Sequence, residues 1–279
     1  MRIITVIGLT LAGLFSLSTV APAASPQDEA REIVRRSVKA DTRNEALRRD
    51  YTYKVLNVFR EPGPARTELF EVLSLGGSTY RHLLERNGQP LPPEDARKEQ
   101  ERLDFAIQEK KKLSDNERNR GARKSQASRA REREMFQHIP EAFDFSPLGE
   151  TEINGRGTWI IAAAPKRDYN GKASGFLRHT EGTLWIDKQD YQWVKVEARA
   201  LDTISLGWFL ARIAKGTRIS LENIRVNDEI WAPKRVAVHG SARLALVKKI
   251  SADQEHIYSD YRKFQTDSRM VSAEDSGNQ

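Results

Sequence analysis

The sequence contains no cysteine among its 279 residues. Disulfides, thiolate metal sites and cysteine nucleophiles are therefore excluded. The five histidines form neither an HExxH motif nor an H-x-H pair, so nothing supports a zinc site. The sequence also lacks a GxSxG elbow and a glycine-rich phosphate loop. We therefore expect no catalytic residues, no metal and no cofactor, and interpret the protein as a non-enzyme.

Long apolar runs are absent except at the N-terminus. Arg2 is followed by the apolar run 3–20 and then by Ala21-Pro22-Ala23. A positive residue, an apolar run and a small-x-small site form the pattern of a cleaved signal peptide. The alternative is a membrane anchor, because a run of about 18 apolar residues can span a bilayer. No Lys/Arg cluster directly follows the run, which favours cleavage. We expect a signal peptide at 1–23 and a periplasmic mature chain.

Acidic residues are outnumbered, with 39 Asp and Glu against 46 Lys and Arg, and the excess is concentrated in residues 110–133. A helix is predicted after Pro92-Pro93, because acidic residues begin this segment and lysines end it. The basic segment has two interpretations: a solvated helix or mobile loop, or a basic arm for anionic lipid headgroups. No aromatic residue lies between these charges to stack on bases, so we expect no nucleic-acid partner.

The remaining chain alternates between helical and strand patterns. Residues 26–49 have apolar residues at helical spacing. Three segments, 51–61, 65–77 and 78–90, are rich in β-branched and aromatic residues and end in turn signals, which predicts an antiparallel meander. Residues 135–150 indicate a short helix or packed loop, and 204–216 a short apolar helix. Further strands are predicted at 155–166, 181–188, 191–200, 216–226, 229–240, 242–252 and 254–264.

The predicted strands are apolar on one face only. In the strand 191–200, Val194, Val196, Ala198 and Ala200 alternate with Trp193, Lys195, Glu197 and Arg199. Val236 and Val238 alternate in the same way. A large sheet must cover its apolar face, and the longest predicted helix is too polar to seal it. The face therefore forms either a closed core or an apolar pocket.

These patterns predict an α+β protein with a large curved antiparallel β-sheet, a half-barrel, covered by a few helices. We expect a single domain over residues 24–266, with a basic helical or loop insert at about 94–135. The polar tail 267–279 is predicted to be disordered.

Two strand motifs carry a resemblance. Residues 182–187 read GTLWID, and residues 228–240 read DEIWAPKRVAVHG, with Asn154-Gly155 opening an earlier strand. In these motifs the chain resembles the outer-membrane lipoprotein-sorting superfamily, which includes the periplasmic lipoprotein carrier and a sigma-factor regulator with a similar half-barrel. The resemblance implies a half-barrel that binds a lipid or a lipidated protein. The long basic insert departs from the compact lid helices of the carriers.

Two functions follow as hypotheses. The first is a periplasmic carrier or binding protein for a lipid, an acyl chain or a lipoprotein, with possible contact to an anionic membrane. The alternative is an envelope-stress sensor or adaptor whose half-barrel binds an envelope protein. Candidate residues of the hydrophobic pocket lie on apolar strand faces or in the segment 204–216, where Trp208 forms either a plug or a latch: Trp159, Ile161, Leu184, Ile186, Val194, Val196, Trp208 and Phe209.

Overall fold

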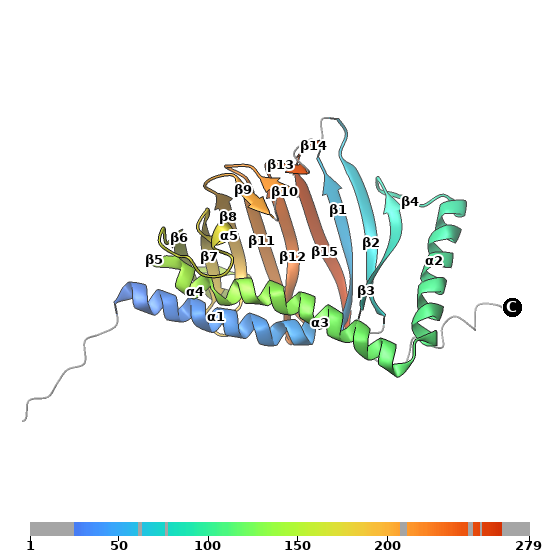
Figure 1. Ribbon diagram of the computed structural model, residues 1–279, viewed down its shortest axis with the longest axis horizontal. Coiled ribbons are helices and arrows are strands. Elements are labelled where there is room, and N and C mark those ends of the chain that lie inside the picture. The colour runs from blue at the N-terminus through green and yellow to red at the C-terminus, as the bar shows by residue number, and fades with distance from the viewer. Residues whose placement is uncertain are drawn as a thin grey trace, which may run out of the picture.

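The computed structural model describes residues 25–60, 63–75, 78–206, 211–244, 248–251 and 253–263. The predicted signal peptide and C-terminal tail lie outside these ranges. Figure 1 shows a long sheet with helices running across its strands. The helices are α1 (Pro26–Arg48), α2 (Pro93–Lys112), α3 (Asp115–Gln137), α4 (Ile139–Ala142) and α5 (Ser174–Leu177).

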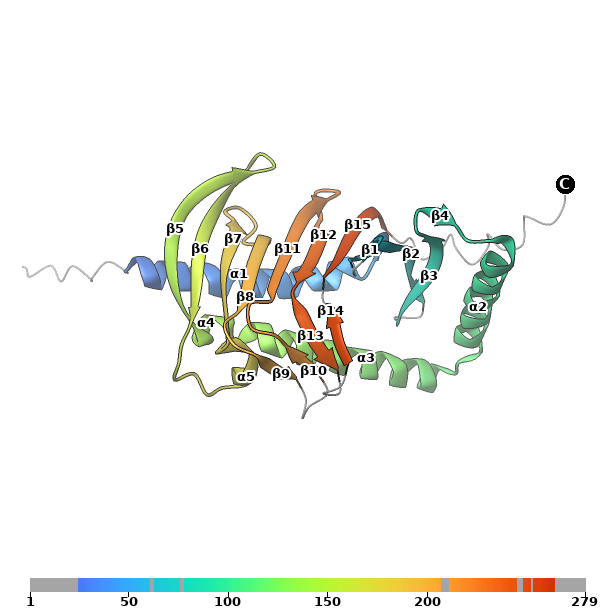
Figure 2. The ribbon, with the colours of Figure 1, turned by 90° about the horizontal axis from the view of Figure 1, so that it is seen from above.

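The main sheet has eleven strands, and every neighbouring pair is antiparallel. In spatial order the strands are β4 (Gln89–Pro90), β3 (Ser78–Arg86), β2 (Arg66–Leu75), β1 (Tyr51–Phe59), β15 (Gln254–Lys263), β12 (Ile230–His239), β11 (Arg218–Val226), β8 (Trp193–Ala200), β7 (Thr180–Asp187), β6 (Arg156–Pro165) and β5 (Phe143–Ile153). Within the described residues, β4 and β5 remain unpaired edges. The sheet is curved and open (Figure 2), which confirms the predicted α+β half-barrel.

Tight turns fix the register of several hairpins. Asn154 and Gly155 both have positive φ, at 52° and 75°, and join β5 to β6. Asn87-Gly88 and Asn227-Asp228 have the same backbone signs between β3 and β4 and between β11 and β12. Two successive residues with positive φ define the turn that matches the natural twist of a hairpin. The expectation that Asn154-Gly155 opens a strand is therefore confirmed.

Helix α1 covers one half of the concave face of the sheet. Ser25 caps its N-terminus by accepting a hydrogen bond from the backbone N–H of Asp28. Its buried residues recur at helical spacing and pack against β5, β6, β7 and β8. The resulting core contains, from α1, Ala30, Ile33, Val34 and Val38, and from the sheet Phe143, Phe145, Ile161, Ala163, Leu184, Ile186 and Trp193.

The basic insert forms two helices. Helix α2, which the sequence predicts, starts at Pro93 and packs against β3 with Leu103 buried. Ser114 and Glu117 form a capping box that starts α3. Helix α3 then returns across the concave side of the sheet (Figure 1) and contacts α1, where Arg133 pairs with Glu45 at 3.4 Å.

A second sheet continues four central strands of the main sheet beyond a bend. Its order is β14 (Lys248–Ser251), β13 (Ser241–Leu244), β10 (Ala211–Ile213) and β9 (Ile204–Leu206), which follows the order β15, β12, β11 and β8. The bend from β12 to β13 requires a glycine, because a Cβ on Gly240 would lie 2.9 Å from the Cα of Thr217.

This second sheet corrects two predictions. Residues 204–216 were expected to be helical, but β9 and β10 pair antiparallel, with Ile204 opposite Ile213. The apolar spacing of this segment fits a hairpin as well as a helix. The predicted single strand 242–252 also divides, because Ala242 on β13 pairs with Ile250 on β14.

Residues 135–150 also differ from the prediction. Only Ile139–Ala142 forms a separate short helix, while Met135 and Phe136 end α3 and the strand β5 begins at Phe143. The two prolines of this segment made a strand unexpected. Pro147 lies at a register shift of β5, an edge strand, where a missing backbone N–H is tolerated.

Candidate ligand-binding face

The concave face contains two different regions. Beneath α1, Ile161, Leu184 and Ile186 are at most 6% exposed and belong to the closed core. Cross-strand pairing continues the row of Ile161 and Leu184 through Val196 and Leu221 to Val236. Side chains paired directly across strands point to the same face. The α1 face therefore extends across β11 and β12, where α1 covers it less completely.

We call the four apolar residues at this place the apolar strip: Ile219, Leu221, Val236 and Val238. Ile219 pairs with Val238, and Leu221 pairs with Val236. All four side chains are half-buried, in contrast to the sealed residues under α1. Beyond the strip the rows become polar, since Val236 pairs with His256 and Val238 pairs with Gln254. The strip is thus a bounded apolar surface between a sealed core and a polar region.

Two crevices open on this face. The first, of about 210 Å³, lies between the start of α1 and the strands β5 and β6, and Ile33, Trp159 and Ile161 line it. The second is a narrow gap of about 10 Å³ at the bend into the second sheet. There Ile204 and Ile213 of the second sheet approach Ala198 and Ile219. The second sheet therefore folds over the concave face at one end of the apolar strip.

The register of β8 departs from strict alternation. Trp185 pairs with Lys195, but the next residue, Ile186, pairs with Trp193 because β8 contains a bulge. Trp193 consequently joins the core, and its Nε1 donates to the Oγ of Ser37 on α1. The prediction that Trp193 shares the face of Lys195 is wrong. Val194, the additional residue at the bulge, is 3% exposed.

The structure places the predicted pocket residues as follows. Trp159 and Ile161 line the crevice beside α1, and Trp159 is only partly buried. Leu184 and Ile186 lie beneath α1, and Val196 packs at the margin of the same core. Val194 is buried at the bulge of β8. Trp208 and Phe209 lie outside the described residues.

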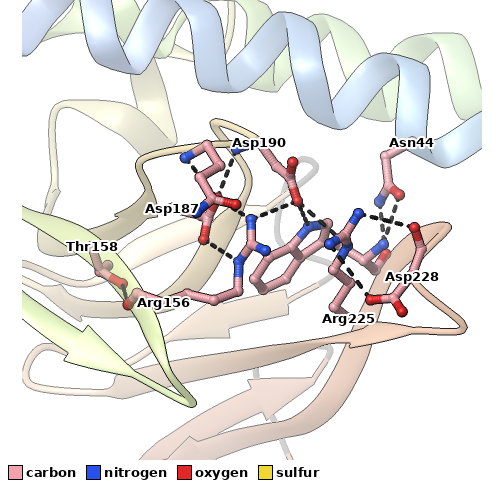
Figure 3. A network of polar contacts seen from close by, with 9 residues as sticks. Asn44, Arg156, Thr158, Asp187, Asp190, Arg225 and Asp228 are labelled. Carbon is pink, nitrogen blue, oxygen red and sulfur yellow. Dashed lines mark hydrogen bonds and ion pairs between the residues drawn. The ribbon is translucent and has the colours of Figure 1, made fainter.

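A polar network ties the two sequence motifs together (Figure 3). Asp187, the last residue of GTLWID, accepts two hydrogen bonds from Arg156, at 2.6 Å from Nε and 2.8 Å from Nη2. The same Nη2 donates to Asp190 at 2.9 Å. Trp231, from the motif IWAP, donates its Nε1 to the same oxygen of Asp190 at 2.9 Å. The two motifs therefore meet at this network.

The network keeps Asp187 ionised although its side chain is fully buried. Burial alone would raise the pKa of Asp187, because a carboxylate loses its hydration. The guanidinium of Arg156 and the backbone N–H groups of Asp190 and Gln189 outweigh that effect, so the pKa lies below its ordinary value. Both carboxylates are held by an arginine in a fixed geometry. Their arrangement is that of a structural clamp and does not support acid–base chemistry.

Asp187 ends β7 and Asp190 lies in the following turn, and local sequence does not reveal their partners. Arg156 lies 31 residues before Asp187, and Trp231 lies 41 residues after Asp190. The local signal was the acidic pair itself, which is common in turns. In the part of the chain that the structure describes, no group of three or more His, Asp and Glu side chains could hold a metal ion. Among the described helices, none combines the length and apolar character needed to cross a membrane.

No protein-family model matches the chain, and no curated protein matches its sequence. Similar solved structures include a domain described as an outer membrane lipoprotein-sorting protein from Vibrio parahaemolyticus. It has 15% identity and a TM-score of 0.34, and the match covers 84% of this chain and 94% of that one. A second is a LolA superfamily protein from Nitrosomonas europaea, with 10% identity, coverage of 85% and 93%, and a TM-score of 0.32.

A chain of the Pseudomonas aeruginosa MucA/MucB complex is also similar, with 10% identity, coverage of 85% and 99%, and a TM-score of 0.24. The first two structures carry the name of the superfamily that the strand motifs resemble. With TM-scores below 0.5, these likenesses carry no conclusion about what this chain binds.

Proposed function

We propose that the chain is an exported periplasmic carrier or binding protein for a lipid, an acyl chain or a lipoprotein. The observation that carries this proposal is the apolar strip. Its paired residues Leu221 and Val236 are half-buried on the concave face, whereas the paired residues Ile161 and Leu184 are sealed beneath α1. Apolar side chains that a fold leaves partly open are the surface that an acyl chain can cover.

The proposed ligand surface starts at the crevice of Trp159 and Ile161 and continues along Val196 to the apolar strip. Leu184 and Ile186 form its floor beneath α1, and Val194 supports the same strand. Trp208 and Phe209, in the connection between β9 and β10, are proposed to contact the ligand at the other end. The proposal assigns the protein no catalytic role and no cofactor.

The test compares two substitutions on opposite faces of the sheet. Val236→Ser changes the apolar strip, whereas Ile257→Ser changes a side chain that is 36% exposed on the outer face. The two positions are neighbours, because Val236 pairs with His256 and Arg235 pairs with Ile257. A delipidated sample of each variant is titrated with a fluorescent fatty acid, and circular dichroism checks that both fold.

We expect saturable binding that Val236→Ser weakens at least fivefold and Ile257→Ser leaves within twofold of the unmodified protein. The absence of saturable binding by the delipidated protein would contradict the proposal. A stoichiometric envelope protein recovered without lipid would instead favour the adaptor, in which the same concave face binds a polypeptide.

A further inference from the structure

A large depression lies outside the proposed ligand surface. It has a volume of about 620 Å³ and crosses β6, β7, β8, β11 and the end of β12 on the outer face. Two rows of paired side chains form its walls. The first row is Ala162, Thr183, Glu197 and Ser220, and the second contains Glu181, Arg199, Arg218 and His239. We call this depression the outer trough.

The floor of the outer trough is backbone between the two rows. Gly182 lies at its centre, and a Cβ added there would lie 2.6 Å from the carbonyl oxygen of Glu197. Ala163 and Ala198 are the neighbours of Gly182 in the same row. The side chains of this row, such as Ala163, point to the concave face, so only backbone lies between the two walls.

Two glutamates and two arginines line the outer trough, but among the described residues only one of the two arginines has a carboxylate partner. Arg199 directs both its Nε and its Nη2 to Oε1 of Glu181, and the Nε bond measures 2.8 Å. Glu197 is paired with Lys195 at 2.6 Å. Both carboxylates therefore have a cation. The exposed side chain of Arg218 has no ion pair or hydrogen bond among the described residues, although it lines the same trough.

The position of Arg218 in the sheet is electrostatically unfavourable. It is paired directly with Arg199 on one side and with His239 on the other. Arg199 and Arg218 are like charges opposite each other on neighbouring strands, and their repulsion lowers the stability of the sheet. An anion bound between the two arginines would remove that repulsion. The hydroxyls of Thr183 and Ser220, on the facing wall, would supply further donors.

We propose that the outer trough binds the phosphate group of a ligand. A carboxylate offers two oxygens, and a single guanidinium can satisfy both in a bidentate pair. Besides the carboxylates of Glu181 and Glu197, which already have cations, the trough presents two guanidinium groups and two hydroxyls. This donor set suits the larger number of oxygens on phosphate. Its volume exceeds what a free phosphate ion fills, so the rest of the ligand lies over the floor at Gly182. This site is independent of the concave face and of any acyl ligand there.

The experiment uses Arg218→Gln, with Arg167→Gln as a matched control. Arg167 is also exposed and has no ion pair or hydrogen bond among the described residues, but it does not line the trough. The two variants therefore have the same net charge. Isothermal titration with glycerol 3-phosphate tests a soluble phosphate ester. Sedimentation with phosphatidylglycerol vesicles, compared with phosphatidylcholine vesicles, tests a lipid headgroup.

We expect Arg218→Gln to weaken at least tenfold the binding of one of these probes, while Arg167→Gln changes it less than twofold. If Arg218→Gln loses binding only to glycerol 3-phosphate, the ligand is a soluble phosphate ester. If it loses binding only to phosphatidylglycerol vesicles, the ligand is a lipid headgroup. The proposal is overturned if the two variants bind both probes equally, or if the unmodified protein binds neither. Fatty-acid binding should stay unchanged in Arg218→Gln. A negative result for the phosphate site would therefore not count against the carrier proposal, which is tested separately.

Discussion

Asn44 of helix α1 bonds to the backbone of Trp231 in the way that a neighbouring strand would. Its Nδ2 donates to the carbonyl oxygen of Trp231 at 2.6 Å, and its Oδ1 accepts from the backbone N–H of Trp231 at 2.8 Å. Both residues are buried. A side-chain amide has the donor and the acceptor that this pairing needs. This contact fixes the end of α1 on β12, beside the polar network of Figure 3.

Replacing Asn44 should therefore destabilise the protein. Asn44→Leu leaves a buried N–H and a buried carbonyl of Trp231 without partners, and each unpaired group costs about 1–3 kcal/mol. Asn44→Asp keeps an acceptor for the N–H but loses the donor to the carbonyl, and it buries a charge. Urea denaturation measures the difference. Thr42→Leu, a change on the same helix at a half-buried position, serves as the control. Equal midpoints for Asn44→Leu and the unmodified protein would show that the pairing does not support the fold.

The pair Arg156–Asp187 predicts an unusual dependence on pH. Arg156→Met leaves the buried carboxylate of Asp187 without its cation, which at neutral pH costs about 3–5 kcal/mol. In the unmodified protein the pKa of Asp187 is lowered below its ordinary value of 3.8. The ionised Asp187 therefore stabilises the folded protein fully above pH 3.8, and this stabilisation is lost as the pH falls through the folded pKa.

In the Arg156→Met variant the pKa of Asp187 shifts in the opposite direction. Burial without the guanidinium raises the pKa of Asp187, so acidification neutralises the group and reduces its cost. The difference in unfolding free energy between the two proteins should therefore narrow as the pH falls toward 4. Denaturation at several pH values measures it. A difference that stays constant with pH would contradict the role of this ion pair.

His256 predicts a second pH dependence. Burial, and to a lesser degree the charge of Arg81, lowers the pKa of His256 below its ordinary value of 6.5. The folded protein therefore prefers the neutral ring of His256. The contribution of His256 to stability is fully present above pH 6.5 and is lost as the pH falls through the folded pKa. His256→Gln should remove it. We expect the two proteins to differ in the slope of stability against pH below 6.5, measured by thermal unfolding. If stability fell with pH at the same rate in both proteins, His256 would not be the group responsible.

The basic helix α3 predicts a salt-dependent membrane contact. Arg120 and Arg123 are exposed on α3. If α3 contacts anionic headgroups, the double change Arg120→Gln and Arg123→Gln should weaken sedimentation with phosphatidylglycerol vesicles severalfold at low salt. The effect should shrink near physiological salt, where charges are screened over about 8 Å. Arg97→Gln with Arg102→Gln on α2 is the matched control for lost charge. The same weakening in both double variants would assign the effect to net charge alone.

The sequence predicted the features that depend on local patterns. The alternation of Val236 and Val238 and the turn Asn154-Gly155 identified strands and hairpins correctly, because period and turn chemistry act within a few residues. The sequence did not reveal the bulge that directs Trp193 into the core, because the bulge depends on the pairing of Trp193 with Ile186 on the neighbouring strand. The partial burial of the apolar strip was also not predictable, because the path of α1 across the sheet decides which residues are sealed.

The central claim is that the concave face holds an apolar ligand. The most direct measurement is mass spectrometry of an organic-solvent extract of the protein, purified from the cells that naturally produce it. We predict a lipid, or an acylated protein, at close to one molecule per chain in the unmodified protein and Ile257→Ser, and much less in Val236→Ser. A preparation without any lipid or acylated protein, or equal amounts in both variants, would contradict the account.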